Sequence, residues 1–112
     1  MRETLGQKQR RFSVAIAKLI LAATEMGYEV TLGDAYRDPR LHGTLGEKKG
    51  YGHANSMHKS RLAVDLNLFK DGKFLTDGAS HSPLHDIWDD FGGAKRIPWD
   101  MNHYSFEHEG MR

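Results

Sequence analysis

The sequence predicts a small α+β domain, in which a mainly antiparallel sheet packs against an N-terminal helix and a second, short helix. Three observations indicate this class. Apolar residues recur every three or four positions in residues 7–26, and they alternate with polar residues in residues 62–69. The elements expected along the chain follow the order helix, strand, loop, hairpin, helix, strand. With 112 residues, the chain has the size of one domain, so residues 1–112 are expected to form a single unit.

The first element is a helix over residues 7–26, which is expected to pack on the core. Phe12, Ile16, Leu19, Ala23 and Met26 form its apolar stripe. Gly27 is a natural stop after its last turn. A membrane-active amphipathic helix is the alternative, but the polar face of this helix is not strongly basic.

A strand over residues 28–36 follows, because Tyr28, Val30 and Leu32 alternate with polar neighbours. Pro39 is expected to end this strand. Residues 41–55 are rich in glycine, lysine and histidine and are expected to form a loop. Loops of that length in compact domains are usually functional or mobile, and we expect this one to border the site.

The second strand is expected over residues 62–69, with Leu62, Val64, Leu66 and Leu68 on one face. Ala63, Asp65 and Asn67 fall on the other face, which gives the sheet an apolar back and a polar front. Asp71-Gly72 is a two-residue turn signal, so residues 73–75 are expected to return as a hairpin strand.

The remaining elements are a short helix and a last strand. After a loop over residues 76–82, Pro83 opens a helix over residues 84–91, which Gly92-Gly93 ends. Residues 94–101 are expected to be irregular around Pro98. The last strand is expected over residues 102–108, with His103, Ser105 and Glu107 on one face.

Composition restricts the classes of function. The net charge of +1 and the pI of about 8.1 are too weakly basic to indicate nucleic acid as a partner. Because the chain has no cysteine, any metal must be held by His, Asp or Glu, and seven histidines are available. The first apolar run, residues 14–23, is interrupted by Lys18 and lacks the features of a signal peptide or a membrane span, so neither export by a leader nor stable membrane insertion is expected.

His58, Asp65 and His103 are the residues that we expect to carry chemistry. Asp65 stands between Val64 and Leu66 in an apolar strand, so its carboxylate should be paired or bound to a metal. An ion pair with Arg61 is the structural alternative. Two histidines and one carboxylate that leave a fourth position open are typical of catalytic zinc sites, in which the metal lowers the pKa of its water to roughly 7.

The other histidines are expected to have ordinary roles. His81, His85 and His108 are expected to be hydrogen-bonded or surface residues. His42 and His53 fall in the glycine-rich loop, where structural or solvated roles are expected and contact with substrate is the alternative.

The motifs Ser56-x-His58, Ala63-x-Asp65 and Asp100-x-x-His103 resemble the zinc D-alanyl-D-alanine carboxypeptidases and the related phage L-alanyl-D-glutamate endopeptidases. Those families cleave the peptide part of bacterial peptidoglycan. The Tyr-Arg segment at residues 36–40 is also similar, and the resemblance spans roughly Leu19 to Glu107. It implies a Hedgehog/DD-peptidase-like fold.

The resemblance also implies roles. His58, Asp65 and His103 would be the zinc ligands, and Asp100 the general base. Arg37 would act in catalysis and substrate binding by clamping a carboxylate or holding the polarised carbonyl oxygen, and Ser56 would steady the loop of His58 or contact the substrate.

Two residues depart from the family pattern. Arg61 replaces a glycine, and Asp100 replaces a glutamate that is one methylene longer, which leaves Glu107 as the rival for general base. Trp99, next to Asp100, is expected to pack as a wall of the site, and stacking on a substrate is the alternative.

The expected function is therefore a zinc-dependent hydrolase, a metallopeptidase of carboxypeptidase or endopeptidase type. It would degrade the cell wall as a phage or prophage endolysin, as a monomer held in the host cytoplasm before host cell lysis. A zinc-containing module of the same fold that binds a ligand without catalysis is the alternative. A small nuclease is a third reading, but the basic residues are spread along the chain rather than clustered. Which peptidoglycan bond would be cut stays open.

Overall fold

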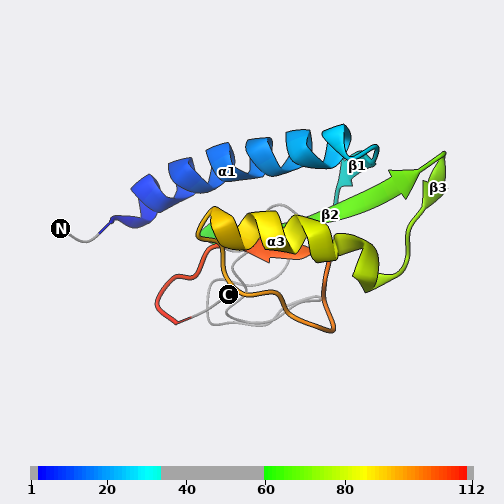
Figure 1. The fold of residues 1–112 in the computed structure, drawn as a ribbon. Helices are drawn as coiled ribbons and strands as arrows, with labels where there is room; N and C mark the ends of the chain where they lie inside the picture. Colours follow the sequence, from blue (N-terminus) through cyan, green and yellow to red (C-terminus); the bar gives the residue numbers. More distant parts are fainter. Residues whose placement is uncertain (1–2, 34–59, 111–112) are drawn as a thin grey trace, which may run out of the picture.

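A computed structural model describes residues 3–33 and 60–110. Its elements are α1 (Leu5–Glu25), β1 (Glu29–Leu32), β2 (Ala63–Lys70), β3 (Lys73–Phe74), the 3₁₀ turn η2 (Gly78–His81), α3 (Ser82–Asp90) and β4 (His103–Ser105). Figure 1 shows β2 running through the middle of the molecule, with α1 above it and α3 in front. The helices and the small antiparallel sheet form the predicted α+β arrangement, so the predicted fold class is confirmed.

Helix α1 begins two residues earlier than the apolar periodicity predicts, because Thr4 caps it. The Thr4 hydroxyl accepts a hydrogen bond from the Gln7 N–H, and the Gln7 side chain accepts one from the Thr4 N–H. This reciprocal capping box satisfies two amide groups that an uncapped helix would leave open. The helix ends before Gly27, whose φ of +93° favours glycine.

Strand β2 is the centre of the described sheet and pairs antiparallel with β1, β3 and β4. The register aligns Leu32 with Leu66 on one side and Asp65 with His103 on the other. The predicted hairpin is confirmed: Asp71 and Gly72 both have positive φ and join β2 to β3. Positive φ at both positions is the turn geometry that matches the twist of an antiparallel pair.

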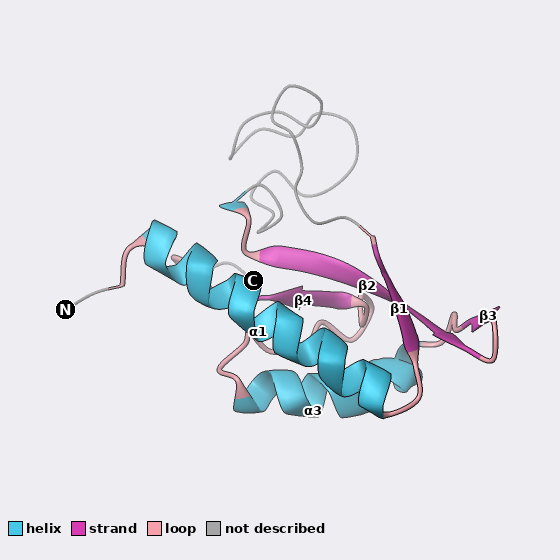
Figure 2. Cartoon of the chain, turned by 90° about the horizontal axis from the view of Figure 1, so that it is seen from above, coloured by secondary structure: helices cyan, strands magenta, loops and turns pink. Residues whose placement is uncertain are grey.

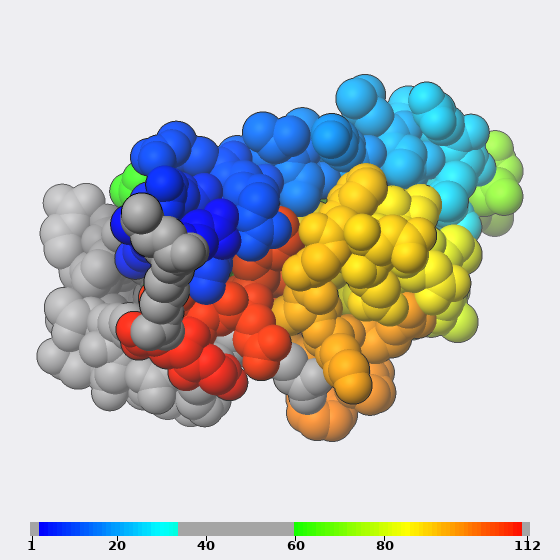
Figure 3. Space-filling model, turned by 60° about the vertical axis from the view of Figure 1, so that its left-hand side comes forward, coloured from blue at the N-terminus to red at the C-terminus, as the bar shows by residue number. Residues whose placement is uncertain are grey.

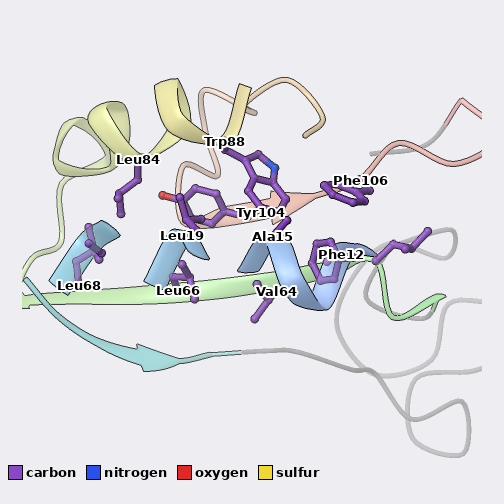
Figure 4. Close-up of a cluster of buried hydrophobic side chains, with 13 residues drawn as sticks. Phe12, Ala15, Leu19, Val64, Leu66, Leu68, Leu84, Trp88, Tyr104 and Phe106 are labelled. Carbon is purple, nitrogen blue, oxygen red and sulfur yellow. The ribbon is translucent and has the colours of Figure 1, made fainter. Parts of the chain in front are cut away.

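The core lies between the sheet and the two helices, which Figure 2 shows on the same side of β2 and β4. Figure 4 shows side chains from α1, β2, α3 and β4 pointing toward one another. Phe12 from α1 makes edge-to-face contacts with Trp88 from α3 and with Phe106, at centroid distances of 5.8 and 5.2 Å. The apolar face predicted for β2 is confirmed, because these core side chains are buried: Leu62, Val64, Leu66 and Leu68.

The bounds of all four strands differ from the prediction, β2 and β3 by one residue at an end and the other two by more. The first strand was expected to reach Tyr36, but β1 ends at Leu32 and residues 34–36 lie outside the described part of the chain. The last strand was expected over residues 102–108, but β4 ends at Ser105. After one further hydrogen bond, from the Phe106 N–H to the Leu62 carbonyl, the chain turns away through Glu109 and Gly110, which both have positive φ.

Candidate functional site

Asp65 and His103 face each other across β2 and β4. They are direct partners in the antiparallel register, and His103 Nδ1 lies 3.4 Å from Asp65 Oδ1. Both side chains are largely buried, with 19% of the Asp65 side chain and 8% of the His103 side chain exposed. Because Val64 and Leu66 turn toward the helices, Asp65 projects from the opposite face of the sheet, as the alternation predicts.

Strand β1 lies close to Asp65, on the side of β2 that does not face β4. The Gly33 N–H donates to the Asp65 carbonyl at 2.7 Å, which extends the pairing of β1 and β2 by one residue. A Cβ atom at position 33 would lie 3.2 Å from the Asp65 Cβ. Glycine at position 33 therefore lets the sheet hold Asp65 between β1 and β4 without a neighbouring side chain pressing on it.

A tight turn connects Asp100 to His103. The His103 N–H donates to the Asp100 carbonyl at 3.1 Å, and the Asp100 N–H donates to the Ile97 carbonyl at 2.9 Å. The Leu66 N–H donates to the Asn102 carbonyl at 2.9 Å, which joins the turn to β2. The backbones of Asp100 and His103 are therefore hydrogen-bonded to each other, while the side chain of Asp100 is exposed to solvent.

His85 supports this turn from α3. Its Nε2–H donates to the Met101 carbonyl at 2.7 Å, and its ring stacks on Tyr104 at a centroid distance of 4.3 Å. Gly78 completes the support, because a Cβ at that position would lie 2.9 Å from the Met101 side chain. Burial lowers the pKa of His85 and outweighs the hydrogen bond to the Met101 carbonyl, which raises it, so the ring stays neutral near pH 7.

His81 also contacts Tyr104. Its Nδ1 is 2.7 Å from the Tyr104 hydroxyl, with which it shares a hydrogen bond. Burial lowers the pKa of His81 to about 4 and raises that of Tyr104, so both are neutral over the physiological range. The expectation that His81, His85 and His108 are surface or hydrogen-bonded residues is confirmed, since His108 also has a partner, the Lys8 amine at 3.0 Å.

Asp100 and Glu107 both remain candidates for the general base. Glu107 lies two residues beyond the end of β4, where its side chain is exposed and its carbonyl accepts a hydrogen bond from Lys8. Asp100 lies on the turn at the other end of β4 and lines a pocket. Trp99, expected to form a wall there, borders the same pocket, yet 83% of it is exposed.

The backbone at Arg61 is in the left-handed region, with φ of +58°. This conformation costs a residue with a side chain roughly 1 kcal/mol more than it costs glycine. In the family that the motifs resemble, this position is a glycine, which adopts positive φ at lower cost.

Three of the predicted site residues, Arg37, Ser56 and His58, lie outside the described residues, as does the loop with His42 and His53. Within residues 3–33 and 60–110, no three His, Cys, Asp or Glu residues are grouped closely enough to hold a metal ion. The described part therefore supplies two adjacent donors, an imidazole and a carboxylate. Both are ligand types that zinc accepts. The metal site itself, which also requires His58, stays a prediction.

No protein-family model matches the chain, and a search of curated proteins also finds no match. Among the described residues, no helix has the length and apolar character required to cross a membrane.

Proposed function

We propose that this protein is a zinc-dependent peptidase that hydrolyses the stem peptides of bacterial peptidoglycan. The observation that carries the proposal is the contact between Asp65 and His103, two donors from different strands held 3.4 Å apart on the face of the sheet that turns away from the core. The motifs that resemble the zinc peptidases of peptidoglycan supply the substrate class. Action as a phage or prophage endolysin rests on that resemblance alone.

His58, Asp65 and His103 would hold the zinc ion. When bound, zinc supplies a Lewis acid and a water whose pKa is lowered to roughly 7. Asp100 would accept a proton from the attacking water and return it to the leaving amine. Its side chain is exposed to solvent, and its backbone carbonyl accepts a hydrogen bond from the His103 N–H.

Arg37 and Ser56 complete the proposed machinery. Arg37 would bind a carboxylate or the carbonyl oxygen of the substrate, because a planar guanidinium matches a planar anion with two parallel hydrogen bonds. Ser56 would hold the segment of His58 or contact the peptide. Both roles come from the motifs of the sequence.

The test combines metal analysis with digestion of purified peptidoglycan, followed by mass spectrometry with and without a chelator. We expect about one zinc per chain, loss of zinc in Asp65→Ala and His103→Ala, and peptide products that disappear with the chelator. Full zinc content in both variants would refute the proposed metal site. The mass of the products identifies the bond that is cut.

Asp100→Asn separates a peptidase from a module that only binds zinc and a ligand. A peptidase should keep its zinc and lose at least about a hundredfold in rate, the usual contribution of a general base. Glu107→Gln is the matched control and should retain its activity. If the two variants behave in the opposite way, Glu107 is the base. If no variant and no wild-type sample releases products while zinc stays bound, the binding module is the correct class.

A further inference from the structure

The turn that carries Asp100 is held at its centre by one side chain of α3. The His103 N–H donates to the Asp100 carbonyl, which closes the turn. Of the two residues between them, Asn102 is bonded through its carbonyl to an N–H of β2. The Met101 carbonyl accepts instead from the His85 Nε2–H, at 2.7 Å. The two central carbonyls of the turn are therefore bonded to different elements, one to the sheet and one to α3.

The ring of His85 is fixed by burial and by stacking. Only 1% of this residue is exposed, and its ring stacks on Tyr104 with an interplanar angle of 14°. Figure 3 shows the yellow surface of α3 beside the orange surface of the segment that follows it and leads to the turn. Met101 is also held by packing, because a Cβ atom at Gly78 would lie 2.9 Å from its side chain. A fixed donor therefore meets a closely packed acceptor.

An imidazole is a costly side chain at this buried position. The Nδ1 of His85 has no hydrogen-bond partner among the described residues, and a buried polar atom without a partner costs free energy. Phenylalanine would fill similar space and could stack on Tyr104 without that cost. What the imidazole adds, within the described part of the chain, is the hydrogen bond to the Met101 carbonyl. The contact with the turn is therefore the feature of His85 that calls for a function.

We propose that His85 is a positioning residue, which holds the turn so that Asp100 keeps its place relative to His103. The inference rests on the proposed peptidase function, in which Asp100 is the general base and His103 a zinc ligand. A displacement of about 1 Å in such a constellation can lower a rate about a hundredfold. His85 acts through the Met101 carbonyl and is not itself a catalytic residue.

The first measurement is amide hydrogen exchange by NMR on the full chain, which needs no peptidase activity. His85→Phe keeps a ring beside Tyr104 and removes the donor to Met101. The His103 amide, which is bonded to the Asp100 carbonyl, should then exchange about threefold to tenfold faster, the effect of losing one hydrogen bond that supports the turn. Wild-type exchange of the His103 amide in this variant would overturn the proposal.

Gly72→Ala is the matched control, because it should also destabilise the chain, but in the β2–β3 hairpin rather than in the turn. It should speed exchange of the Leu75 amide, which is bonded to the Leu68 carbonyl, more than that of the His103 amide. His85→Phe should show the reverse order. Equal acceleration of the His103 amide in both variants would indicate a general loss of stability and would also overturn the proposal.

Peptidase kinetics test the consequence for catalysis. In His85→Phe, kcat should fall about tenfold to a hundredfold with KM nearly unchanged, because the base is misplaced while the substrate still binds. His85→Gln restores an N–H donor near the position of Nε2 but loses the ring that stacks on Tyr104. It should recover both kcat and the slow exchange of the His103 amide. If His85→Gln is as slow an enzyme as His85→Phe, the hydrogen bond is not what matters and the positioning role is rejected.

The two proposals fail in different ways. If the wild type releases no product from peptidoglycan, the peptidase is rejected, and the exchange of the His103 amide still decides whether His85 holds the turn. If the wild type is active and His85→Phe keeps its full kcat, the peptidase stands and the role of His85 is rejected.

Discussion

Acidification is expected to destabilise this protein through His81, an imidazole that the fold keeps neutral. Burial lowers its pKa from the ordinary 6.5 to about 4, with a further decrease from the neighbouring His85 and an opposing effect from Asp77. The unfolded chain, in which the pKa returns to its ordinary value, therefore binds more protons between these two pH values. Stability that is present above pH 6.5 is lost as the pH falls toward 4.

The two pKa values set the magnitude. Between pH 7.5 and pH 5, the His81 contribution to the free energy of unfolding should fall by roughly 2 kcal/mol. For a domain of this size, a loss of that order is a large part of the total stability. This loss in the free energy of unfolding should therefore be detectable by equilibrium unfolding.

The assay is urea unfolding at pH 7.5 and pH 5.0, with a chelator present so that metal binding does not contribute. His81→Asn removes the titration and keeps an acceptor for the Tyr104 hydroxyl near the position of Nδ1. The wild type should lose about 2 kcal/mol more than His81→Asn between the two pH values. His108→Asn, which changes a less buried histidine bonded to Lys8, should behave as the wild type does. The same loss in the wild type and in His81→Asn would refute the reasoning.

Three further substitutions test the supports of the candidate site and the sheet. Gly33→Val places a side chain against Asp65 and should weaken zinc binding in a competition titration with a chromophoric chelator. His85→Phe keeps the ring beside Tyr104 but loses the hydrogen bond to the Met101 carbonyl; urea unfolding should show a loss of about 1–3 kcal/mol. Gly72→Ala forces a side chain into positive φ and should cost about 1–2 kcal/mol in the same assay.

The controls for these variants come from the same chain. Gly6→Ala, inside α1, has ordinary space for its methyl group and should stabilise by up to about 1 kcal/mol. Unchanged zinc affinity in Gly33→Val would show that Asp65 tolerates a close neighbour. Wild-type stability in His85→Phe would remove the role assigned to His85, and a stable Gly72→Ala would contradict the turn geometry.

The polar face of the sheet could be predicted because strand alternation is a local property. Leu62, Val64, Leu66 and Leu68 leave only one direction for Asp65, and the same reasoning applies to His103 in the last strand. The turn at Asp71-Gly72 was also predictable, since few residue pairs accept positive φ at both positions. The roles of Arg37, Ser56 and His58 stay predictions, because these residues lie outside the described part.

The start of α1 could have been found in the sequence but was missed. The apolar stripe begins well inside the helix, so periodicity alone predicts a start at residue 7. Thr4 and Gln7 have the spacing of a capping box, which marks the true start near Leu5.

The support behind the site could not be derived from local patterns. His85 reaches a carbonyl 16 residues away, and His81 reaches a hydroxyl 23 residues away. Each contact depends on how α3 and the turn before it pack against β4 and the segment that precedes it. The hydrophobic periodicity of a short segment does not predict such packing. The exposure of Trp99 has the same origin, since it depends on which side of a short irregular turn faces the core.

The order of the strands along the chain has a consequence for synthesis. The ribosome releases β1, β2 and β3 before β4, so a hairpin that already contains Asp65 can form while His103 is still absent. The Asp65–His103 contact can arise only when β4 docks against the earlier strands. If zinc binds this pair, the metal would favour the docked form over the open one, because binding free energy becomes folding free energy. Metal supply would then influence how β4 docks, in addition to the proposed catalysis.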